Sequence, residues 1–225
     1  MKNECKICGL KSKATTKLTD DEIEQLSYNC APVKFRKGDS LIKQGTFSTN
    51  VVYLKYGLAM VHIAGPYREQ IVKIVKSPSY MGLPTTFGDK INQYSVTVID
   101  DAEVCFIDIN AFRTLLKSNS DFSYEIMLEL CRNELEVFTR FANRTQKQIR
   151  GKIADVLLEL SDSIYSSPVF KLPITQEDLG NLVDSSRESI SRVLTEFNND
   201  GIIKISGKKI EIKDRKKLLL ISSNG

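Results

Sequence analysis

The most informative part of the chain lies near its C-terminus, where residues 173–213 read PITQEDLGNLVDSSRESISRVLTEFNNDGIIKISGKKIEIK. Thr175 with Asp178, and Ser185 with Glu188, each form the hydroxyl-x-x-acid pattern that caps the N-terminus of a helix. The two predicted helices begin ten residues apart, with a tight turn at Asp184 between them. This spacing is typical of a helix-turn-helix.

Apolar side chains at helical spacing give each of these two helices an inner face. They are Leu179 and Leu182 on the first helix, and Ile190, Val193, Leu194 and Phe197 on the second. Gly201 is expected to end the second helix. The stretches IIKI and KIEI then alternate around Ser206-Gly207, which predicts a small two-stranded wing. The segment is therefore predicted to be a winged helix-turn-helix.

The second helix begins with SRESISR, and its polar residues lie on or beside the exposed face of its first two turns. Arginine can donate two hydrogen bonds to guanine, and glutamate can accept one from cytosine N4. The candidate base-reading residues are Arg187, Glu188, Ser191 and Arg192. The candidate phosphate contacts are Thr175, Ser185, Ser186, Ser189, Lys204, Lys208 and Lys209. The alternative, an ordinary solvated helix face, is disfavoured by the two-helix context.

The rest of the chain divides into a strand-rich region and a long helix. After a short capped helix at Thr19, the runs VVYL, LAMVHIA, QIVKIV, YSVTVI and EVCFI predict the strands of a compact antiparallel roll. Residues 121–142 contain no Gly or Pro and predict a helix of about six turns. The fold class is α+β. The expected domains are 1–120 for the N-terminal helix and β-roll, 121–144 for the long helix and 145–225 for the winged helix-turn-helix.

The apolar residues of the long helix form a stripe wider than a single packing contact needs. One surface is expected to pack on the roll and the other on a second copy of the chain, which predicts a homodimer. The candidate dimer-interface residues are Ile126, Leu130, Val137 and Phe141. Cys131, on the same stripe, is expected to be a small core residue. A helix packed wholly inside one chain is the alternative.

Composition excludes several classes of protein. The 225 residues carry 32 Lys+Arg against 28 Asp+Glu, a net charge of +4, so any nucleic-acid site must be local. No apolar run approaches a membrane span and the polar start lacks the core of a signal peptide, so a cytoplasmic protein without a membrane partner is expected. One histidine argues against a metalloenzyme barrel, and the chain is predicted not to be an enzyme.

The chain resembles the cyclic AMP receptor protein and fumarate-nitrate reductase regulator (Crp/Fnr) family of bacterial transcription factors. The resemblance extends from FRKGDSLIKQG and LKYGLAMVHI to SRESISRVLTEFNNDGII. It implies a cyclic-nucleotide-binding-like jelly roll, a dimerisation helix, a palindromic operator in double-stranded DNA and RNA polymerase as a further partner. It also implies that Arg187 and Arg192 contact guanine and backbone, that Glu188 reads a cytosine and that Ser191 reads a base. A shift of the long helix about a hinge near Asn143 would reposition the recognition helices.

The effector region departs from the family pattern. Members that bind cyclic AMP carry Gly-Glu and, about a dozen residues later, an Arg that pairs with the cyclic phosphate. Here Gly82 remains, but Leu83 stands at the Glu position and Tyr94 at the Arg position before Ser95, so the phosphate would lack its charge partner. Cyclic AMP is not expected to bind in the family's manner, and the effector stays unknown. An effector-free regulator whose roll is only a dimerisation scaffold is the alternative.

The five cysteines leave several interpretations open. Cys5 and Cys8 form a Cys-x-x-Cys pair, and the resemblance places Cys105 where oxygen-sensing members keep their last iron-sulfur ligand. The third N-terminal cysteine of those members is missing, and the next cysteine here is Cys30. An iron-sulfur cluster, a zinc site, a redox disulfide between Cys5 and Cys8, and a vestigial pair all stay open. Neither the cluster nor zinc is favoured.

Overall fold

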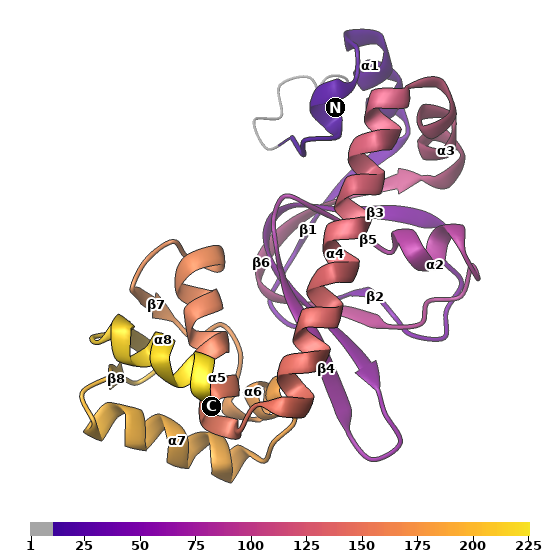
Figure 1. The fold of residues 1–225 in the computed structure, drawn as a ribbon. Coiled ribbons are helices and arrows are strands. Elements are labelled where there is room, and N and C mark those ends of the chain that lie inside the picture. The colour runs from indigo at the N-terminus through magenta and orange to yellow at the C-terminus, as the bar shows by residue number, and fades with distance from the viewer. Residues whose placement is uncertain (1–10) are drawn as a thin grey trace. The chain divides into compact units, whose positions relative to one another are not determined.

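A computed structural model describes residues 11–225, which divide into two units. One unit holds residues 11–67 and 72–135, and the other holds residues 68–71 and 136–225. The division falls inside helix α4 (Ser120–Gln146), which is continuous over 27 residues (Figure 1). The domain boundaries expected at residues 120 and 144 stay predictions.

The first unit is an antiparallel β-roll, as the alternating apolar runs predict. The strands of the roll are β1 (Cys30–Phe35), β2 (Ser40–Ile42), β3 (Asn50–Ala64), β4 (Glu69–Lys76), β5 (Ser79–Met81) and β6 (Ser95–Asp108), and the first three residues of β4 are grouped with the other unit. The central ladder pairs β3 with β6, from Asn50 opposite Asp108 to His62 opposite Ser95. VVYL and LAMVHIA belong to the one strand β3, because the register shifts around Gly57 (φ +99°) without ending the strand.

Apolar side chains fill the interior of the roll. Val52 and Leu54 of β3 point into the roll, whereas Val51 and Tyr53 are buried on the opposite face of the strand, which is why this run is apolar at every position. The buried cluster contains Leu41, Ile42, Val52, Leu54, Ala59, Val61, Val75, Met81, Val96, Val98, Ala102 and Val104. Removing this apolar surface from water stabilises the roll.

A second apolar cluster lies at the end of the roll where α1 (Asp20–Tyr28), α3 (Ile109–Ser118) and the start of α4 gather (Figure 1). α1 is capped as expected: the Thr19 hydroxyl accepts from the Glu22 amide at 3.3 Å, and the Glu22 carboxylate accepts from the Thr19 amide at 2.9 Å. Phe112 and Phe122 are fully buried and pack edge to face, with ring centroids 5.4 Å apart. These contacts fix the first turns of α4 on the roll.

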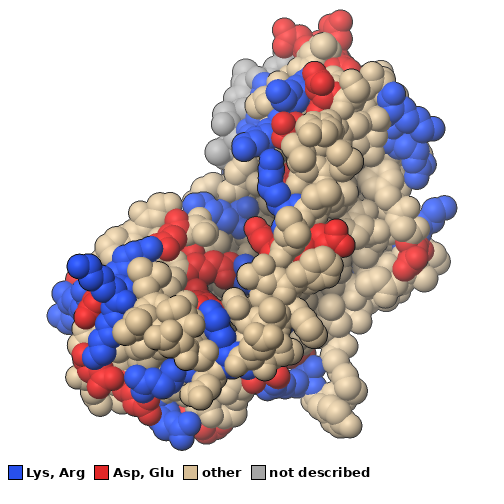
Figure 2. Space-filling view, in the orientation of Figure 1, with Lys and Arg blue, Asp and Glu red and all other residues tan. Residues whose placement is uncertain are grey.

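Helix α4 presents two different apolar faces. Phe122 and Ile126 are buried in the cluster at the end of the roll. The exposed apolar residues are Tyr124, Met127, Leu130, Leu135, Val137, Phe138 and Phe141. Figure 2 shows a largely uncharged band along α4 on the side turned to the viewer. The assignment of Ile126 to a dimer interface is wrong, because the side chain is only 4% exposed in the core of its own unit. Cys131 is exposed, so its expected place in a core is also wrong.

The second unit is a winged helix-turn-helix. Its elements are α5 (Ile149–Glu159), a π-helix (Leu160–Ile164), β7 (Val169–Lys171), α6 (Gln176–Val183), α7 (Arg187–Asn199), β8 (Ile203–Ser206), β9 (Lys209–Ile212) and α8 (Arg215–Asn224). The wing has three strands in the order β7-β9-β8, one more than predicted. The C-terminal segment forms the helix α8, which starts at an Asp214 cap and buries Leu218. None of the described helices has an apolar stretch long enough to cross a lipid bilayer.

Tyr80 on β5 ties the start of the described chain to the roll. Its hydroxyl lies 2.9 Å from Thr15 Oγ1 and accepts from the Ser12 hydroxyl at 3.5 Å. The side chain is buried, and this burial raises the pKa of Tyr80 to about 12. The neutral phenol is therefore the form that the folded unit stabilises.

Alkaline pH is expected to destabilise this unit through Tyr80. Because the folded-state pKa lies above the ordinary value near 10, the contribution is complete below about pH 10 and is lost as the pH rises toward about 12. The loss is about 2–3 kcal/mol of unfolding free energy. Tyr80→Phe should remove most of this fall in unfolding free energy above pH 10. Near neutrality the variant should be less stable by about 1 kcal/mol, because its hydrogen bonds are lost. Urea unfolding from pH 8 to 12 measures both effects, and an unchanged slope in the variant would contradict the assignment.

Candidate nucleic-acid interface

Helix α6 begins where its capping pattern predicts. The Thr175 hydroxyl accepts from the Asp178 amide at 3.0 Å. The Asp178 carboxylate in turn accepts from the amide of Thr175 at 2.9 Å and from its hydroxyl at 2.7 Å. Thr175 is exposed at this helix N-terminus, where backbone N–H groups and the helix dipole favour an anion such as a phosphate.

The turn between α6 and α7 is very tight. Asp184 ends α6 in the left-handed conformation, with φ 58° and ψ 57°, so the expected turn at this residue is confirmed. A Cβ atom at Gly180 would lie 2.8 Å from the backbone carbonyl oxygen of Ser185. The chain can fold back onto α6 only because residue 180 has no side chain.

Helix α7 begins later than its sequence pattern predicts. Its cap is Ser186, whose Oγ accepts from the Ser189 amide at 3.2 Å, and not the expected pair of Ser185 and Glu188. The helices start at Gln176 and Arg187, eleven residues apart and not ten. The turn explains the difference, because the Ser185 amide donates to the Gly180 carbonyl at 2.9 Å and so belongs to the turn.

One face of α7 is buried and the other is open. The buried residues are Ile190, Val193, Leu194 and Phe197, and α6 contributes Leu179, Leu182 and Val183 to the same core. All four candidate base-reading residues are exposed. They line one shallow groove on α7, which is formed by Gln176, Arg187, Glu188, Ser191, Arg192, Thr195, Glu196 and Asn199. The sequence interpretation missed Thr195 and Asn199, although residues 188, 192, 195 and 199 recur at helical spacing.

Glu188 is kept ionised at the start of α7. Hydrogen bonds to its own backbone amide and to Ser186, together with the charge of Arg187, lower the pKa of the Glu188 carboxyl. An ionised carboxylate can only accept hydrogen bonds, which matches the amino group of cytosine and not the acceptor edge of guanine.

The wing presents its lysines near the same helices. β8 and β9 are joined by Gly207 and Lys208, one residue later than the expected Ser206-Gly207 turn, with Gly207 at φ +61°. Lys204, Lys208 and Lys209 are exposed. A second hollow, between α6, α7 and the wing, includes Thr175, Arg187 and Lys208 in its lining. Figure 2 shows Lys and Arg side chains spread over this unit with acidic side chains between them.

The candidate effector residues of the roll bond within the protein. The Gly82 amide donates to the Tyr94 hydroxyl at 3.0 Å, and the Ser95 hydroxyl accepts from the Gln44 amide at 3.0 Å. Leu83 is buried in the cluster at the end of the roll. Burial raises the pKa of Tyr94, and the bond from the Gly82 amide partly offsets this effect. The structure thus brings Gly82 and Tyr94 into direct contact.

Two of the cysteines lie on neighbouring strands. In the register of β1 and β6, Cys30 lies opposite Ile107, which is two residues after Cys105. Because side chains two residues apart on a strand point to the same face, Cys30 and Cys105 lie on one face of the sheet. Cys105 is buried in the cluster at the end of the roll, and Cys30 packs against this cluster. Cys5 and Cys8 lie outside the described residues. Within residues 11–225, no three His, Cys, Asp or Glu side chains gather as a set of metal ligands.

Known proteins match both units. A family model described as a cyclic nucleotide-binding domain matches residues 32–119, and a Crp-like helix-turn-helix domain matches residues 151–221. The chain is 23% identical over 201 residues to the CRP-like cAMP-activated global transcriptional regulator of Mycobacterium tuberculosis, covering 87% of this chain and 90% of that protein. It is 25% identical over 222 residues to the transcriptional activator protein FnrA of Stutzerimonas stutzeri, covering 94% and 88%.

The fold is shared with solved structures at low sequence identity. FixK2 from Bradyrhizobium japonicum superposes with a TM-score of 0.79 at 16% identity, covering 87% of this chain and 98% of that one. The two family models account for most of the chain. The model of the cyclic nucleotide-binding domain covers the roll, and that of the helix-turn-helix domain covers the C-terminal unit, with the long helix between them. The chain therefore belongs to the Crp/Fnr family of bacterial DNA-binding transcription regulators.

Proposed function

We propose that this protein is a homodimer that binds a palindromic operator in double-stranded DNA and regulates transcription there. The groove on α7 carries the proposal, because two arginines, a glutamate and a serine share one exposed face of a helix-turn-helix. A recognition helix inserts such a face into the major groove. A local site of this kind also fits a chain whose net charge is only +4.

Each polar side chain of the interface has a DNA group that it can contact. Arg187 and Arg192 donate to guanine O6 and N7 or to phosphate, Glu188 accepts from cytosine N4, and Ser191 contacts a base edge. The phosphate contacts are proposed for Thr175, Ser185, Ser186, Ser189, Lys204, Lys208 and Lys209. RNA polymerase is the proposed further partner of the bound dimer, as the family implies.

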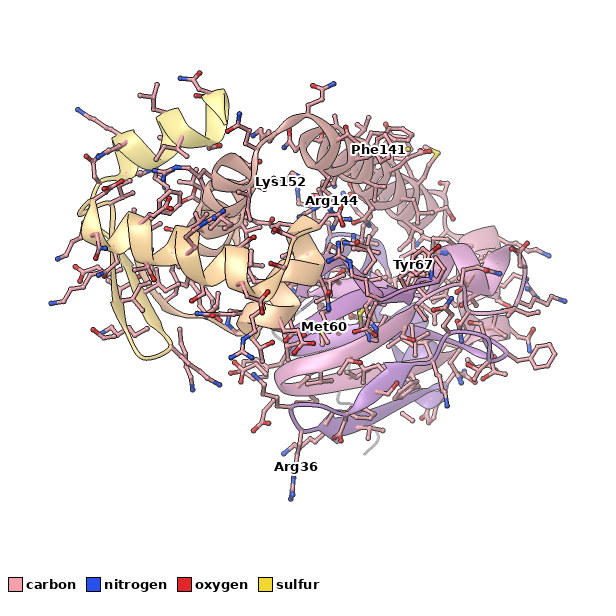
Figure 3. All side chains as sticks on the ribbon, turned by 90° about the horizontal axis from the view of Figure 1, so that it is seen from below. Arg36, Met60, Tyr67, Phe141, Arg144 and Lys152 are labelled. Atoms are coloured by element: carbon pink, nitrogen blue, oxygen red, sulfur yellow. The ribbon has the colours of Figure 1, made fainter. Side chains whose placement is uncertain are left out.

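The exposed face of α4 supports the pairing of two copies. Residues at alternating spacings of three and four form a heptad seam. They are Tyr124, Met127, Cys131, Glu134, Phe138 and Phe141. Leu130 and Val137 flank this seam. The rings of Phe138 and Phe141 are 60% and 68% exposed, and Phe141 projects from the helix in Figure 3. Two copies paired here would present two recognition helices to half-sites about one DNA turn apart.

The roll is proposed to respond to a signal other than cyclic AMP. The Tyr94 hydroxyl accepts from the Gly82 amide, and Leu83 lies in the core, which supports this proposal. A shift of α4 would then change the separation of the recognition helices. The helix continues past the hinge expected at Asn143 and first breaks at Lys147. An effector-free regulator is the alternative, and footprinting with and without cell extract would distinguish the two.

A cysteine-based metal sensor is a second candidate function, favoured by the position of Cys30. Cys105 lies in the cluster that also contains Ala14, near the start of the described chain, and Cys30 packs against this cluster. Cys30 would supply the thiolate that the N-terminal cysteine pattern lacks. Four thiolates are the donor set of structural zinc sites and of iron-sulfur clusters.

Arg187→Ala is expected to weaken operator binding by about 1–3 kcal/mol per half-site and to relax the preference at one base pair. Lys208→Ala, the contrasting variant, should weaken binding to all sequences alike and lower the salt dependence by about one unit of slope. Competition binding against a randomised operator library, repeated at several salt concentrations, measures the base preference and the salt dependence of each variant. Wild-type selectivity in Arg187→Ala would exclude this residue from base reading.

Replacing the two exposed rings of α4 by charges is expected to abolish the dimer. Phe138→Glu combined with Phe141→Glu would bury four carboxylates in the interface of a dimer, a cost that the lost apolar contacts cannot offset. Sedimentation velocity measures the change. Phe47→Glu, at a ring that is 78% exposed on the roll, is the control and should leave the dimer intact. A monomeric wild type would contradict the proposal.

Cyclic AMP is expected to show no micromolar binding in a calorimetric titration, since the phosphate would meet Tyr94 where a charge is required. Tyr94→Arg restores a cation at this position and is expected to bind cyclic AMP more tightly than the wild type does. Micromolar affinity of the wild type would refute the proposal.

Protein purified without oxygen is expected to contain zinc, or iron with sulfide, if the cysteine sensor exists. Elemental analysis should show that Cys30→Ser loses the metal as Cys105→Ser does, whereas Cys131→Ser on α4 keeps it. A Cys30→Ser variant that retains full metal content would exclude Cys30 as a ligand. A metal-free wild type would eliminate this candidate and leave the DNA-binding proposal intact.

A further inference from the structure

We infer that Arg150 is a positioning residue for the recognition helix, and that it acts through Glu196 on the DNA-reading side chain of Arg192. The inference rests on the proposed DNA-binding function and deepens it. All of the residues concerned lie in one unit of the structure, on α5 and α7.

Arg150 holds the C-terminal half of α7 by three contacts. Its Nη1 donates to Glu196 Oε2, and its Nη2 lies 3.5 Å from Asp200 Oδ2. Its guanidinium carbon lies 5.2 Å from the centre of the Phe197 ring. A planar guanidinium can bond to carboxylates at its edge while its face lies on an aromatic ring, which an ammonium group cannot do equally well.

The three partners of Arg150 are fixed parts of α7. Phe197 is fully buried in the core of the unit, and Asp200 is the residue that caps the end of the helix. Glu196 lies one turn after Arg192 and lines the groove that faces DNA in the proposed complex. Arg150 therefore fixes both the end of the recognition helix and the carboxylate nearest to its exposed arginine.

Glu196 lies between two arginines. Its Oε2 accepts from Arg150, while its Oε1 lies 3.9 Å from Nε of Arg192. The side chain of Arg192 is 70% exposed, and with Arg150 in place it is available to DNA. Without Arg150, Glu196 would leave an unbalanced negative charge beside the phosphates and would attract Arg192 to itself. Both effects lower the affinity for DNA.

Arg150 also lies close to the end of the long helix. It is the second residue of α5, which follows α4 after the break at Lys147 and Gln148. A change in the direction of α5 at this break is transmitted to α7 through the contacts of Arg150. This residue thus connects the proposed movement of α4 to the placement of the recognition helix.

The test uses the full-length protein and an operator selected by the wild type from a random library. Arg150→Gln is expected to lower affinity for this operator by roughly tenfold to hundredfold, the effect of one lost base contact. The double variant Arg150→Gln, Glu196→Gln should recover most of the affinity, because no unbalanced carboxylate remains. The salt slope should fall by clearly less than the 0.9 expected for one lost phosphate contact in Arg150→Gln, since Arg150 itself contacts no phosphate in the proposed complex. Fluorescence anisotropy at several salt concentrations measures the affinity of each variant and its salt dependence.

Arg215→Gln is the matched control. Arg215 makes a bidentate pair with Asp162 at 2.7 and 2.9 Å, which joins α8 to the π-helix of the same unit. This substitution should leave operator affinity unchanged. Glu196→Gln alone keeps the inference testable if Arg150→Gln fails to fold. It should bind at least as tightly as the wild type, and a loss of affinity would overturn the inference.

Two further results would overturn it. The first is a failure of Glu196→Gln to rescue Arg150→Gln. The second is an equal loss of specific and non-specific affinity in Arg150→Gln with a salt slope lowered by about 0.9, which would make Arg150 a direct phosphate contact. A wild type that binds no DNA sequence would instead refute the proposed function, and the inference with it.

Discussion

The DNA-binding unit depends on one close contact, between the backbone of Gly180 and the carbonyl of Ser185. An added Cβ would lie 2.8 Å from that oxygen, so any other residue would force the turn open. Because the turn stays closed, the apolar face of α7 meets α6 and becomes buried. The opposite face of α7, which begins at Arg187, is then exposed to solvent. The proposed base-reading face therefore depends on a position that carries no side chain.

A second constraint is the continuity of α4. Phe122 and Ile126 hold its first turns in the core of the roll, and the helix then runs without interruption to Gln146. Its exposed rings leave an apolar surface that a second copy would cover in the proposed dimer. The break at Lys147 is followed at once by α5, where Arg150 holds Glu196 and Phe197 of the recognition helix. In the proposed function, one backbone segment thus connects the signal, the dimer and the DNA contact.

Local patterns predicted much of this architecture. Thr19 and Thr175 cap helices as their following acidic residues indicate, and the alternating runs form the roll. The capping pattern gave the wrong residue at Ser185. The Ser185 amide bonds within the tight turn, and Ser186 caps α7 instead. β7 was missed because it has only three residues and owes its pairing to β9. α8 was missed because its position depends on burial of Leu218, which sequence periodicity does not reveal.

The order of the elements and the chemistry of the exposed side chains follow from the sequence alone, because caps, turns and apolar spacing act over a few residues. The groove residues Arg187, Glu188, Ser191 and Arg192 are of this kind. Only the tertiary structure showed that Ile126 faces the core, that the Tyr94 hydroxyl accepts a hydrogen bond from the Gly82 amide, that Cys30 lies near Cys105 and that Arg150 of α5 bonds to Glu196 of α7. The physical reason is that these contacts join residues from separate elements, and no local pattern encodes which side chains will meet across them.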